Sequence, residues 1–335
     1  MTVHLTLQSG GAGSYLTAGV VQRELVRPGD EHRMAFTDTL YEDADAYRFL
    51  LEGALRVFGR PAKWVPQAED FPDFRLLPVN FKIEDYHGAP KWREYLRQLR
   101  ERAAEEIPEL IWIVEGRDIW EVYRDERFLG NSSFDPCSKI TKRQPLDRLL
   151  NAEFDREDTV IYFGIGGAEA HRYAGFDEKT CSVTGIRPRF LAKGWNAQAP
   201  LIGRPEGELN PAFYLERDGL KVPRLYAWAA HNNCGGECCK AGVRHQRRRL
   251  ENAPERFSYS AVMERKISDY LGGGRTFLED RREGGRKPMS LFDLAERFKP
   301  GLDLEALIAA DEAARADSGN GCGCMSEDDD HEAFA

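Results

Sequence analysis

The N-terminal stretch Val3-His4-Leu5-Thr6-Leu7-Gln8-Ser9-Gly10-Gly11-Ala12-Gly13-Ser14 decides the fold. It begins as a short apolar run and ends as a glycine-rich turn bracketed by two serines, and residues 15–25 then read as a helix. Glycines let backbone N–H groups converge on an anion, and a helix N-terminus adds partial positive charge at the same place. The stretch therefore predicts a strand, a phosphate-binding loop and a helix, although many glycine turns at strand ends bind nothing.

A second unit of the same kind follows. Residues 34–39 look like a buried strand that ends in Asp38 and Thr39, and a helix is expected from Leu40 to Leu50. An acidic residue at the end of the second strand of a βαβ unit commonly meets a ribose or base edge. We expect an α/β fold with a doubly wound, mostly parallel sheet. Asp38 and Thr39 would lie near the ribose or adenine, and the phosphate cradle would be formed by Ser9, Gly10, Gly11, Gly13 and Ser14.

The two units carry a family resemblance. Residues 9–14 resemble the pyrophosphate loop of the PP-loop (adenine nucleotide alpha-hydrolase) superfamily, whose usual form is Ser-Gly-Gly-x-Asp-Ser. The run Asp38-Thr39-x-Tyr41 is similar to the Asp-Thr-Gly-Tyr segment of phosphoadenylyl-sulfate (PAPS) reductases. Gly13 stands where the loop usually has its aspartate, so a carboxylate that would handle pyrophosphate or Mg²⁺ is missing.

Three further blocks extend the resemblance. Residues 137–146 resemble the Cys-Cys-x-x-Arg-Lys-x-x-Pro-Leu block of iron–sulfur adenylyl-sulfate reductases, with Pro136 in place of one cysteine. A strand over 160–165 leads to Gly166–Arg172, similar to the family's Gly-x-Arg-x-x-Glu-x-x-Arg segment, and residues 234–239 stand where those reductases carry Cys-x-x-Cys. Because the blocks follow the family's order from residue 3 to 240, the resemblance implies catalytic roles for Cys137, Arg172 and Cys234, and phosphate contacts from Lys142 and Arg172.

The cysteines decide which chemistry is open to the chain. Cys137, Cys234 and Cys238 could supply three thiolates to one [4Fe–4S] cluster, which would leave one iron open, and Cys239 is a candidate fourth ligand. We expect the three sulfurs to lie within a few ångströms of each other, facing the 9–14 loop. Thiolates also suit zinc, and the alternatives are a zinc or redox thiol pair, or a Cys137 that is merely a core thiol. We expect Cys181 to be structural, and Cys322 and Cys324 lie in the tail.

Composition sets the remaining expectations. The chain has 335 residues and a net charge of −9, which argues against general charge-driven binding to nucleic acid. No apolar run approaches a membrane span and no signal peptide is evident, so we expect a cytoplasmic protein without a membrane partner, and reduced thiols. We expect one catalytic domain over residues 1–300, with an insertion at about 63–127, and a C-terminal helix with a disordered acidic tail over 301–335. The basic run from Arg244 to Arg249 would form either a solvated helix face or a contact to RNA, DNA or a second phosphate.

Three functions remain open. The resemblance implies an adenine-nucleotide enzyme acting at the α-phosphate in sulfur chemistry, either a PAPS-reductase-like oxidoreductase or an ATP-dependent sulfurtransferase that thiolates a nucleic-acid base or a small molecule. The nucleotide would be ATP or PAPS, and the macromolecular partner a nucleic acid or a thioredoxin-like protein. The glycine at position 13 keeps a third reading open, that of a nucleotide-binding protein without activity.

Overall fold

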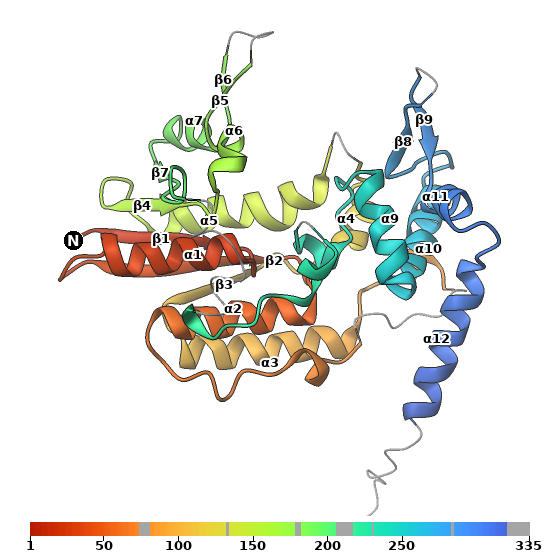
Figure 1. Cartoon of the computed structure of the whole chain (residues 1–335), viewed down its shortest axis with the longest axis horizontal. Coiled ribbons are helices and arrows are strands. Elements are labelled where there is room, and N and C mark those ends of the chain that lie inside the picture. The colour runs from red at the N-terminus through yellow and green to blue at the C-terminus, as the bar shows by residue number, and fades with distance from the viewer. Residues whose placement is uncertain are drawn as a thin grey trace, which may run out of the picture.

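The computed structural model describes residues 1–73, 81–131, 134–177, 182–205, 217–229, 231–282 and 285–319. Cys181, Cys322 and Cys324 therefore lie outside the described residues, as does most of the expected acidic tail. Figure 1 shows an α/β body, from which two hairpins and the helix α12 (Leu304–Gly319) project.

The centre of this body is a five-stranded sheet with the strand order β3-β2-β1-β4-β7. Its strands are β1 (Val3–Gln8), β2 (Glu31–Asp38), β3 (Leu110–Val114), β4 (Thr159–Tyr162) and β7 (Asn196–Gln198), and all four pairings are parallel. The chain runs outward from β1 to β3 and then returns to the other side of β1 at β4. The strand order thus reverses between β1 and β4, and open α/β sheets bind ligands beyond the carboxyl ends of the strands at such a point. The expected α/β fold with a parallel, doubly wound sheet is confirmed.

Helices cover both faces of the sheet. The helices α1 (Ala12–Val20), α2 (Ala44–Val57) and α3 (Pro90–Glu106) enclose one core, in which Tyr47, Leu51 and Trp92 are buried. The helix α5 (Gln144–Glu153) covers the other face, where Leu150 packs with Leu5 of β1 and Ile161 of β4. Because β3 pairs with β2, the stretch 63–127 that we expected to be an insertion supplies an edge strand of the central sheet.

A second core lies beside the carboxyl ends of the strands. It is built from α4 (Ile119–Asp125), α9 (Val243–Asn252), α10 (Pro254–Tyr270) and α11 (Leu291–Phe298), with Trp120, Phe257 and Phe277 fully buried among them. Among the described residues, no helix is both long and apolar enough to cross a lipid bilayer. The remaining regular segments are short. Two are the helices α6 (Ala170–Tyr173) and α7 (Ile186–Leu191), and two are hairpins, β5 (Gly175–Asp177) with β6 (Ser182–Thr184) and β8 (Leu278–Asp280) with β9 (Lys287–Met289). The rest are π-helical turns at 21–25 and 138–143 and 3₁₀ turns at 68–70, 83–85, 167–169, 224–227 and 233–236.

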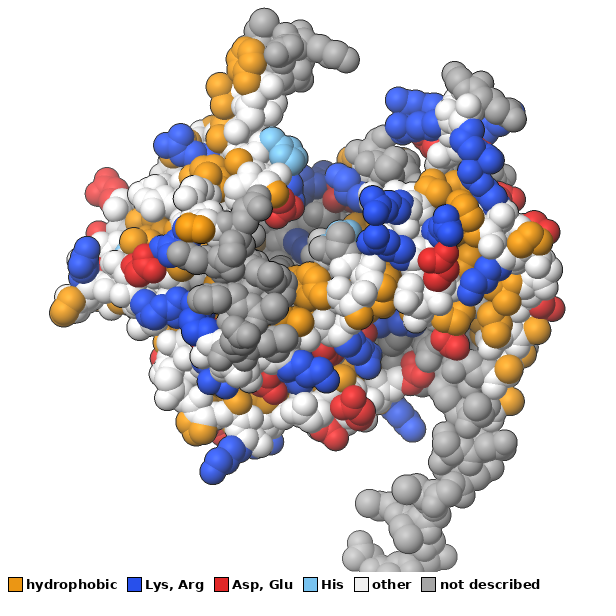
Figure 2. Space-filling view, viewed as in Figure 1, with side chains coloured by type: hydrophobic (Ala, Val, Ile, Leu, Met, Phe, Trp, Pro, Cys, Tyr) orange, Lys and Arg blue, Asp and Glu red, His pale blue; other side chains and the backbone are white. Residues whose placement is uncertain are grey.

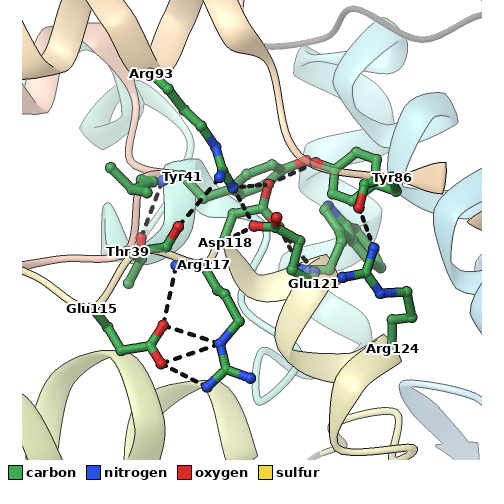
Figure 3. A network of polar contacts seen from close by, with 12 residues as sticks. Thr39, Tyr41, Tyr86, Arg93, Glu115, Arg117, Asp118, Glu121 and Arg124 are labelled. Carbon is green, nitrogen blue, oxygen red and sulfur yellow. Dashed lines mark hydrogen bonds and ion pairs between the residues drawn. The ribbon is translucent and has the colours of Figure 1, made fainter. Parts of the chain in front are cut away.

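A buried polar network joins the two cores at the start of α4 (Figure 3). The carboxylate of Asp118 accepts the backbone N–H groups of residues 120 and 121, and the Glu121 carboxylate accepts the N–H of Asp118 at 2.8 Å. Arg93 from α3 pairs with Glu121, and the Tyr86 hydroxyl donates to Asp118 at 2.7 Å. Burial, reinforced by the neighbouring Glu121, raises the pKa of Asp118 to about 6. The capping box thus fixes the position of α4 against α3, and with it the second core against the sheet.

Candidate functional site

The 9–14 loop connects β1 to α1 in a closed, hydrogen-bonded turn. Gly10 has a φ of +67°, which glycine adopts without strain. The Ser14 hydroxyl donates to the Gly11 carbonyl at 2.8 Å and accepts the N–H of Ser9 at 3.2 Å. The two serines that bracket the turn in sequence therefore hold it closed, and the glycines leave its outer surface without side chains.

A later segment of the chain covers this loop. The Asn232 side-chain amide donates to the Gly10 carbonyl at 2.7 Å, and the N–H of Ala12 donates to the Tyr226 hydroxyl at 3.2 Å. A Cβ on Gly11 would come within 2.9 Å of the Tyr226 oxygen and 3.1 Å of Asn232 Oδ1. Position 11 therefore requires glycine because two polar side chains approach the backbone there.

Gly13, the residue that departs from the PP-loop pattern, faces the segment after β4. A Cβ at position 13 would lie 2.9 Å from the carbonyl oxygen of Gly164. A Cβ on Gly164 would in turn lie 2.6 Å from the N–H nitrogen of Ser14. The two backbones touch at the point where the strand order reverses, so this chain has no room for the aspartate of the usual loop.

Asp38 and Thr39 sit at the carboxyl end of β2, as expected, but both are buried. Both carboxylate oxygens of Asp38 are hydrogen-bonded: one accepts the Tyr47 hydroxyl at 2.6 Å, and the other accepts the Trp112 indole N–H at 3.0 Å. Burial raises the pKa of Asp38 to about 6. The Thr39 hydroxyl donates to Glu42 at 3.1 Å. In this structure the two side chains hold the turn after β2 in place.

Glu42 is a site residue that we did not predict. Its side chain is 1% exposed, and Oε1 accepts from Lys142 Nζ at 3.0 Å. Its other oxygen, Oε2, is buried and has no hydrogen-bond partner among the described residues. Burial by itself would lower the pKa of Lys142, but the carboxylate of Glu42 outweighs it and the pKa is raised. The site thus holds a permanently charged lysine beside a carboxylate with one unused oxygen, which is costly unless something binds there. The acidic residue just after Asp38-Thr39 was the only signal in the sequence.

His231 borders the same Lys–Glu pair. Its ring stacks on that of His245 at 4.9 Å with an interplanar angle of 10°, and the His245 Nε2 lies 2.8 Å from the Gly236 carbonyl oxygen. Burial lowers the pKa of His231, and the nearby His245 lowers it further. Its Nδ1 is buried without a partner among the described residues. His231 is therefore a neutral imidazole at pH 7, with one nitrogen left to bind a proton or a ligand.

The cysteines meet at the edge of the second core. The thiols of Cys137 and Cys238 each hydrogen-bond the thiol of Cys239, and Cys234 is close enough to interact electrostatically with Cys137 and Cys238. The Tyr123 hydroxyl lies 3.3 Å from the Cys137 sulfur. Cys137 is thus brought to the 234–239 segment, as expected, and Cys239 lies between the other two thiols. Sequence spacing had placed Cys239 only as a candidate fourth ligand.

The four thiols differ in acidity. The hydrogen bond from Cys239 lowers the pKa of Cys238 to about 7, against burial, with further help from the Lys240 N–H and Lys142. The Cys239 thiol likewise lowers the pKa of Cys137. Burial raises the pKa of Cys234 instead. Cys238 is also the one of these four that is not fully buried.

These thiols do not have the arrangement of a bound metal. Across the described ranges of the chain, no group of three or more His, Cys, Asp or Glu side chains has the geometry of a metal site. The donor chemistry is nevertheless that of a soft-metal or iron–sulfur site, because the side chains in contact are thiols.

Buried ion pairs tie the cysteine segment to α2. Glu237, fully buried, accepts the Tyr41 hydroxyl at 3.1 Å, the Arg256 side chain at 3.0 Å, and the Ser260 hydroxyl. Arg256 also donates to Asp43 at 2.6 Å, at the N-terminus of α2. Burial would raise the pKa of Asp43, but Arg256 and a second arginine, Arg224, outweigh it and lower the pKa. The glutamate within the cysteine motif therefore positions the cysteine loop against the end of the sheet.

The two groups of arginines considered for binding phosphate or a polyanion are Arg172 and the basic run on α9. Arg172 lies on the short helix α6, is 55% exposed, and pairs with Glu169. It acts on this site by lowering the pKa of His231 at a distance. In the basic run on α9, Arg247 is 53% exposed, but Arg249 is 1% exposed and its guanidinium lies over the Phe257 ring. Neither alternative for this run, a solvated helix face or a contact to a polyanion, holds at Arg249, because α9 turns this side chain into the second core.

Comparisons with known proteins give a distant likeness to solved structures. Neither the scan of protein-family models nor the search of curated proteins finds a match. Among solved structures, the chain is similar to the crystal structure of the phosphate complex of PAPS reductase from Candida auris, with 10% sequence identity and a TM-score of 0.32. The match covers 67% of this chain and 76% of that one.

Proposed function

We propose that the chain binds an adenine nucleotide on the 9–14 loop and acts at the α-phosphate in sulfur chemistry, as the resemblance to PAPS reductase-like enzymes implies. The observation that carries this proposal is the segment 231–239. It contacts the loop through Asn232 and the Gly10 carbonyl at 2.7 Å, and it also brings Cys238 and Cys239 to Cys137. A nucleotide on the loop would therefore lie next to thiols.

The phosphates would be held by backbone and by charge. The N-terminus of α1 would supply a favourable field for a phosphate at the 9–14 loop. Lys142, kept charged by Glu42, would balance the phosphate charge, and Ser9, Ser14 and Arg172 would add polar contacts. Thr39 and Asp38 would contribute indirectly, because their hydrogen bonds hold the turn that carries Glu42.

The thiol set suits an iron–sulfur cluster in its chemistry. Cys137, Cys234 and Cys238 would hold a [4Fe–4S] cluster, with Cys239 as the further thiol in contact with two of them. Such a cluster, when bound, supplies an iron that can bind substrate or sulfide. Around it, this chain's own residues would bind and orient the nucleotide, and the Nδ1 of the neutral His231 would accept a proton as the reaction proceeds.

One observation favours a second candidate, an ATP-dependent sulfurtransferase. Cys238 has a pKa near 7 and is partly exposed, so about half of it is thiolate at neutral pH. A thiolate of this kind can take a sulfane sulfur from a persulfide donor, whose own thiolate leaves. The outer sulfur would then attack the adenylated carbon and displace AMP, and a second thiol would cleave the S–S bond and end in a disulfide with Cys238. A PAPS reductase would instead take two electrons from a dithiol partner such as a thioredoxin-like protein and release sulfite.

Anaerobic purification tests for the cluster, and calorimetry tests which nucleotide binds. We expect a brown protein whose iron and acid-labile sulfide fit one [4Fe–4S] cluster per chain, and single Cys→Ala changes at Cys137, Cys234 or Cys238 should remove the colour. Calorimetry with ATP and with PAPS then identifies the nucleotide. A colourless protein containing stoichiometric zinc would contradict the cluster but keep the nucleotide site. A protein that binds neither nucleotide would overturn the proposal.

A further inference from the structure

A second pocket lies away from the 9–14 loop, on the outer side of the cysteine cluster. It measures about 270 Å³ and opens between residues 127–131 and the base of the β8–β9 hairpin. Three of its lining side chains are arginines, Arg127, Arg275 and Arg286, and its one acidic lining residue is Glu279. Arg286 is 68% exposed, and its nearest guanidinium nitrogen lies 3.9 Å from Glu279, at the limit of an ion pair. Such a pocket suits an anion better than a neutral ligand.

An exposed aromatic side chain adjoins this pocket. Phe134 is 49% exposed and meets Phe128, which lines the pocket, edge to face at 5.1 Å. Asn131, another lining residue, holds Phe134 beside the pocket, because its side-chain oxygen accepts the N–H of Phe134 at 3.0 Å. Burying a large aromatic residue would stabilise the protein, so a Phe held half in solvent beside three arginines suggests a surface for a planar ligand.

The positive charge continues beyond the pocket. Figure 2 shows Lys and Arg side chains gathered over α9 and the β8–β9 hairpin, along one side of the hollow in this face. Within the part of the chain that the structure describes, the guanidinium groups of Arg244, Arg248 and Arg275 have no carboxylate partner. Residues 240–299 carry fifteen Lys and Arg against nine Asp and Glu, although the whole chain has a net charge of −9. This part of the chain is therefore basic, in contrast to the chain as a whole.

We propose that this surface binds single-stranded nucleic acid. The Arg127–Arg275–Arg286 pocket would take a backbone phosphate, Phe134 would stack on an unpaired base, and Arg244 and Arg248 on α9 would follow the backbone. An aromatic platform beside a basic groove is the usual means of binding single strands, whereas a duplex hides its base faces. RNA and DNA share this chemistry, and the two are separated by the test.

The proposed nucleic-acid surface adjoins the cysteine cluster. Gly130, between the pocket and the aromatic pair, packs so closely on the cysteine cluster that a Cβ there would lie 2.8 Å from the Cys239 sulfur. The same segment reaches Cys137 three residues after Phe134. A base on Phe134 would therefore lie close to the thiols. The inference goes beyond the nucleotide chemistry proposed above and does not depend on it.

Fluorescence anisotropy with labelled 20-nucleotide single-stranded RNA and DNA tests the proposal directly. We expect the wild type to bind at least one of them at 50 mM salt, more tightly than the matching duplex. The triple variant Arg127→Ala/Arg275→Ala/Arg286→Ala should bind at least tenfold more weakly, and the slope of log K against log salt should fall by about 0.7, since about 0.7 counterion is released per phosphate neutralised on a single strand. A control triple variant, Lys91→Ala/Arg97→Ala/Lys193→Ala, removes the same charge from other exposed positions and should bind like the wild type.

Phe134→Leu isolates the base contact. It should weaken single-strand binding by about fivefold or more, because base–aromatic stacking contributes that much, and leave the salt slope unchanged. Several results would overturn the proposal: no binding of either strand, equal losses in the control triple variant, or a preference for duplex that Phe134→Leu does not affect. Binding to phosphatidylserine vesicles but not to oligonucleotides would also overturn it. Gly11→Val alters the 9–14 loop and crowds Tyr226 and Asn232, none of which lines this pocket, so it should leave oligonucleotide binding intact and failure of the nucleotide site is recognised separately.

Discussion

Gly13, at the start of α1, and Gly164, just after β4, touch backbone to backbone, with the position of a Cβ on Gly13 only 2.9 Å from the Gly164 carbonyl oxygen. The contact brings the segment after β4 directly onto the 9–14 loop. It also leaves no room for the aspartate of the PP-loop pattern at this position, since a side chain on residue 13 would push α1 away from the segment after β4.

We therefore predict that Gly13→Asp, which restores the usual motif, will harm the protein. Overpacking of this kind costs on the order of 1–3 kcal/mol, and the variant should lose that much free energy of unfolding in urea together with its nucleotide binding. Gly167→Asp is the matched control, because a Cβ at Gly167 meets nothing within 4 Å. A Gly13→Asp variant that is as stable as the control would contradict the contact.

Blocking the loop surface should abolish nucleotide binding. In Gly11→Val the new side chain meets Tyr226 and Asn232 and distorts the loop that would hold the phosphates, so calorimetry should detect no ATP or PAPS binding. Because the same side chain also crowds Tyr226, we expect Tyr226→Phe/Gly11→Ala to fold normally and still to bind at least tenfold more weakly than Tyr226→Phe alone. Unchanged affinity in the double variant would remove the loop from the nucleotide site.

The Lys142–Glu42 pair should be strongly coupled. Lys142→Ala leaves a buried carboxylate without its partner, and we expect a loss on the order of 2–4 kcal/mol in the free energy of unfolding. Adding Glu42→Gln should recover most of this loss, as a double-mutant cycle would show. The surface pair Lys193–Asp147 provides the comparison, since Lys193→Ala should cost less than about 1 kcal/mol.

The buried carboxyl of Asp38 makes stability depend on pH. Its pKa is raised from 3.8 to about 6, so the folded protein binds this proton more tightly than the unfolded chain does. Its contribution is fully present below pH 3.8 and is lost as the pH rises through 6. Between pH 4 and 7 the change is on the order of 2–3 kcal/mol, with Asp118 acting in the same direction.

Asp38→Asn should therefore flatten the decline in stability measured by urea unfolding between pH 4 and 7. The variant should also be less stable throughout, because its amide N–H₂ would face the Trp112 indole N–H that Asp38 now accepts. An unchanged slope in Asp38→Asn would show that this carboxyl is already ionised in the folded protein at low pH.

Cys238 should be the most reactive of the described thiols in reduced, metal-free protein. Peptide mapping after iodoacetamide treatment should give an alkylation midpoint near pH 7 at Cys238, well below the ordinary pKa of 9.0. Cys239→Ala removes the hydrogen bond responsible and should move the midpoint upward. If Cys234 were alkylated first, the acidities assigned to the cluster would be reversed.

Much of the fold was predictable from local sequence. The apolar run before Ser9, the glycines after it and the helical pattern that follows are short-range signals, and they correctly gave β1, the loop and α1. Repetition of such units implies a parallel sheet, because a helix that crosses over between two neighbouring strands lets both run in the same direction. The sequence did not reveal that β3 belongs to this sheet, since a short apolar strand after a long helix reads equally well as part of an insertion.

The site was only half determined in this way. The sequence alone identified the loop. It also predicted that Cys137 lies near the 234–239 segment, because cysteines at these positions are typical of a shared cluster or thiol site. Only the tertiary structure decided that residue 13 must be small and that Glu42 forms an ion pair with Lys142. It also decided that Cys239 contacts two other thiols and that Arg249 is buried. The physical reason is the distance along the chain over which each effect acts. Backbone propensity and turn chemistry act between a few neighbouring residues. These contacts instead depend on which distant loops the reversal of strand order between β1 and β4 brings together, and on how deeply each side chain is then buried.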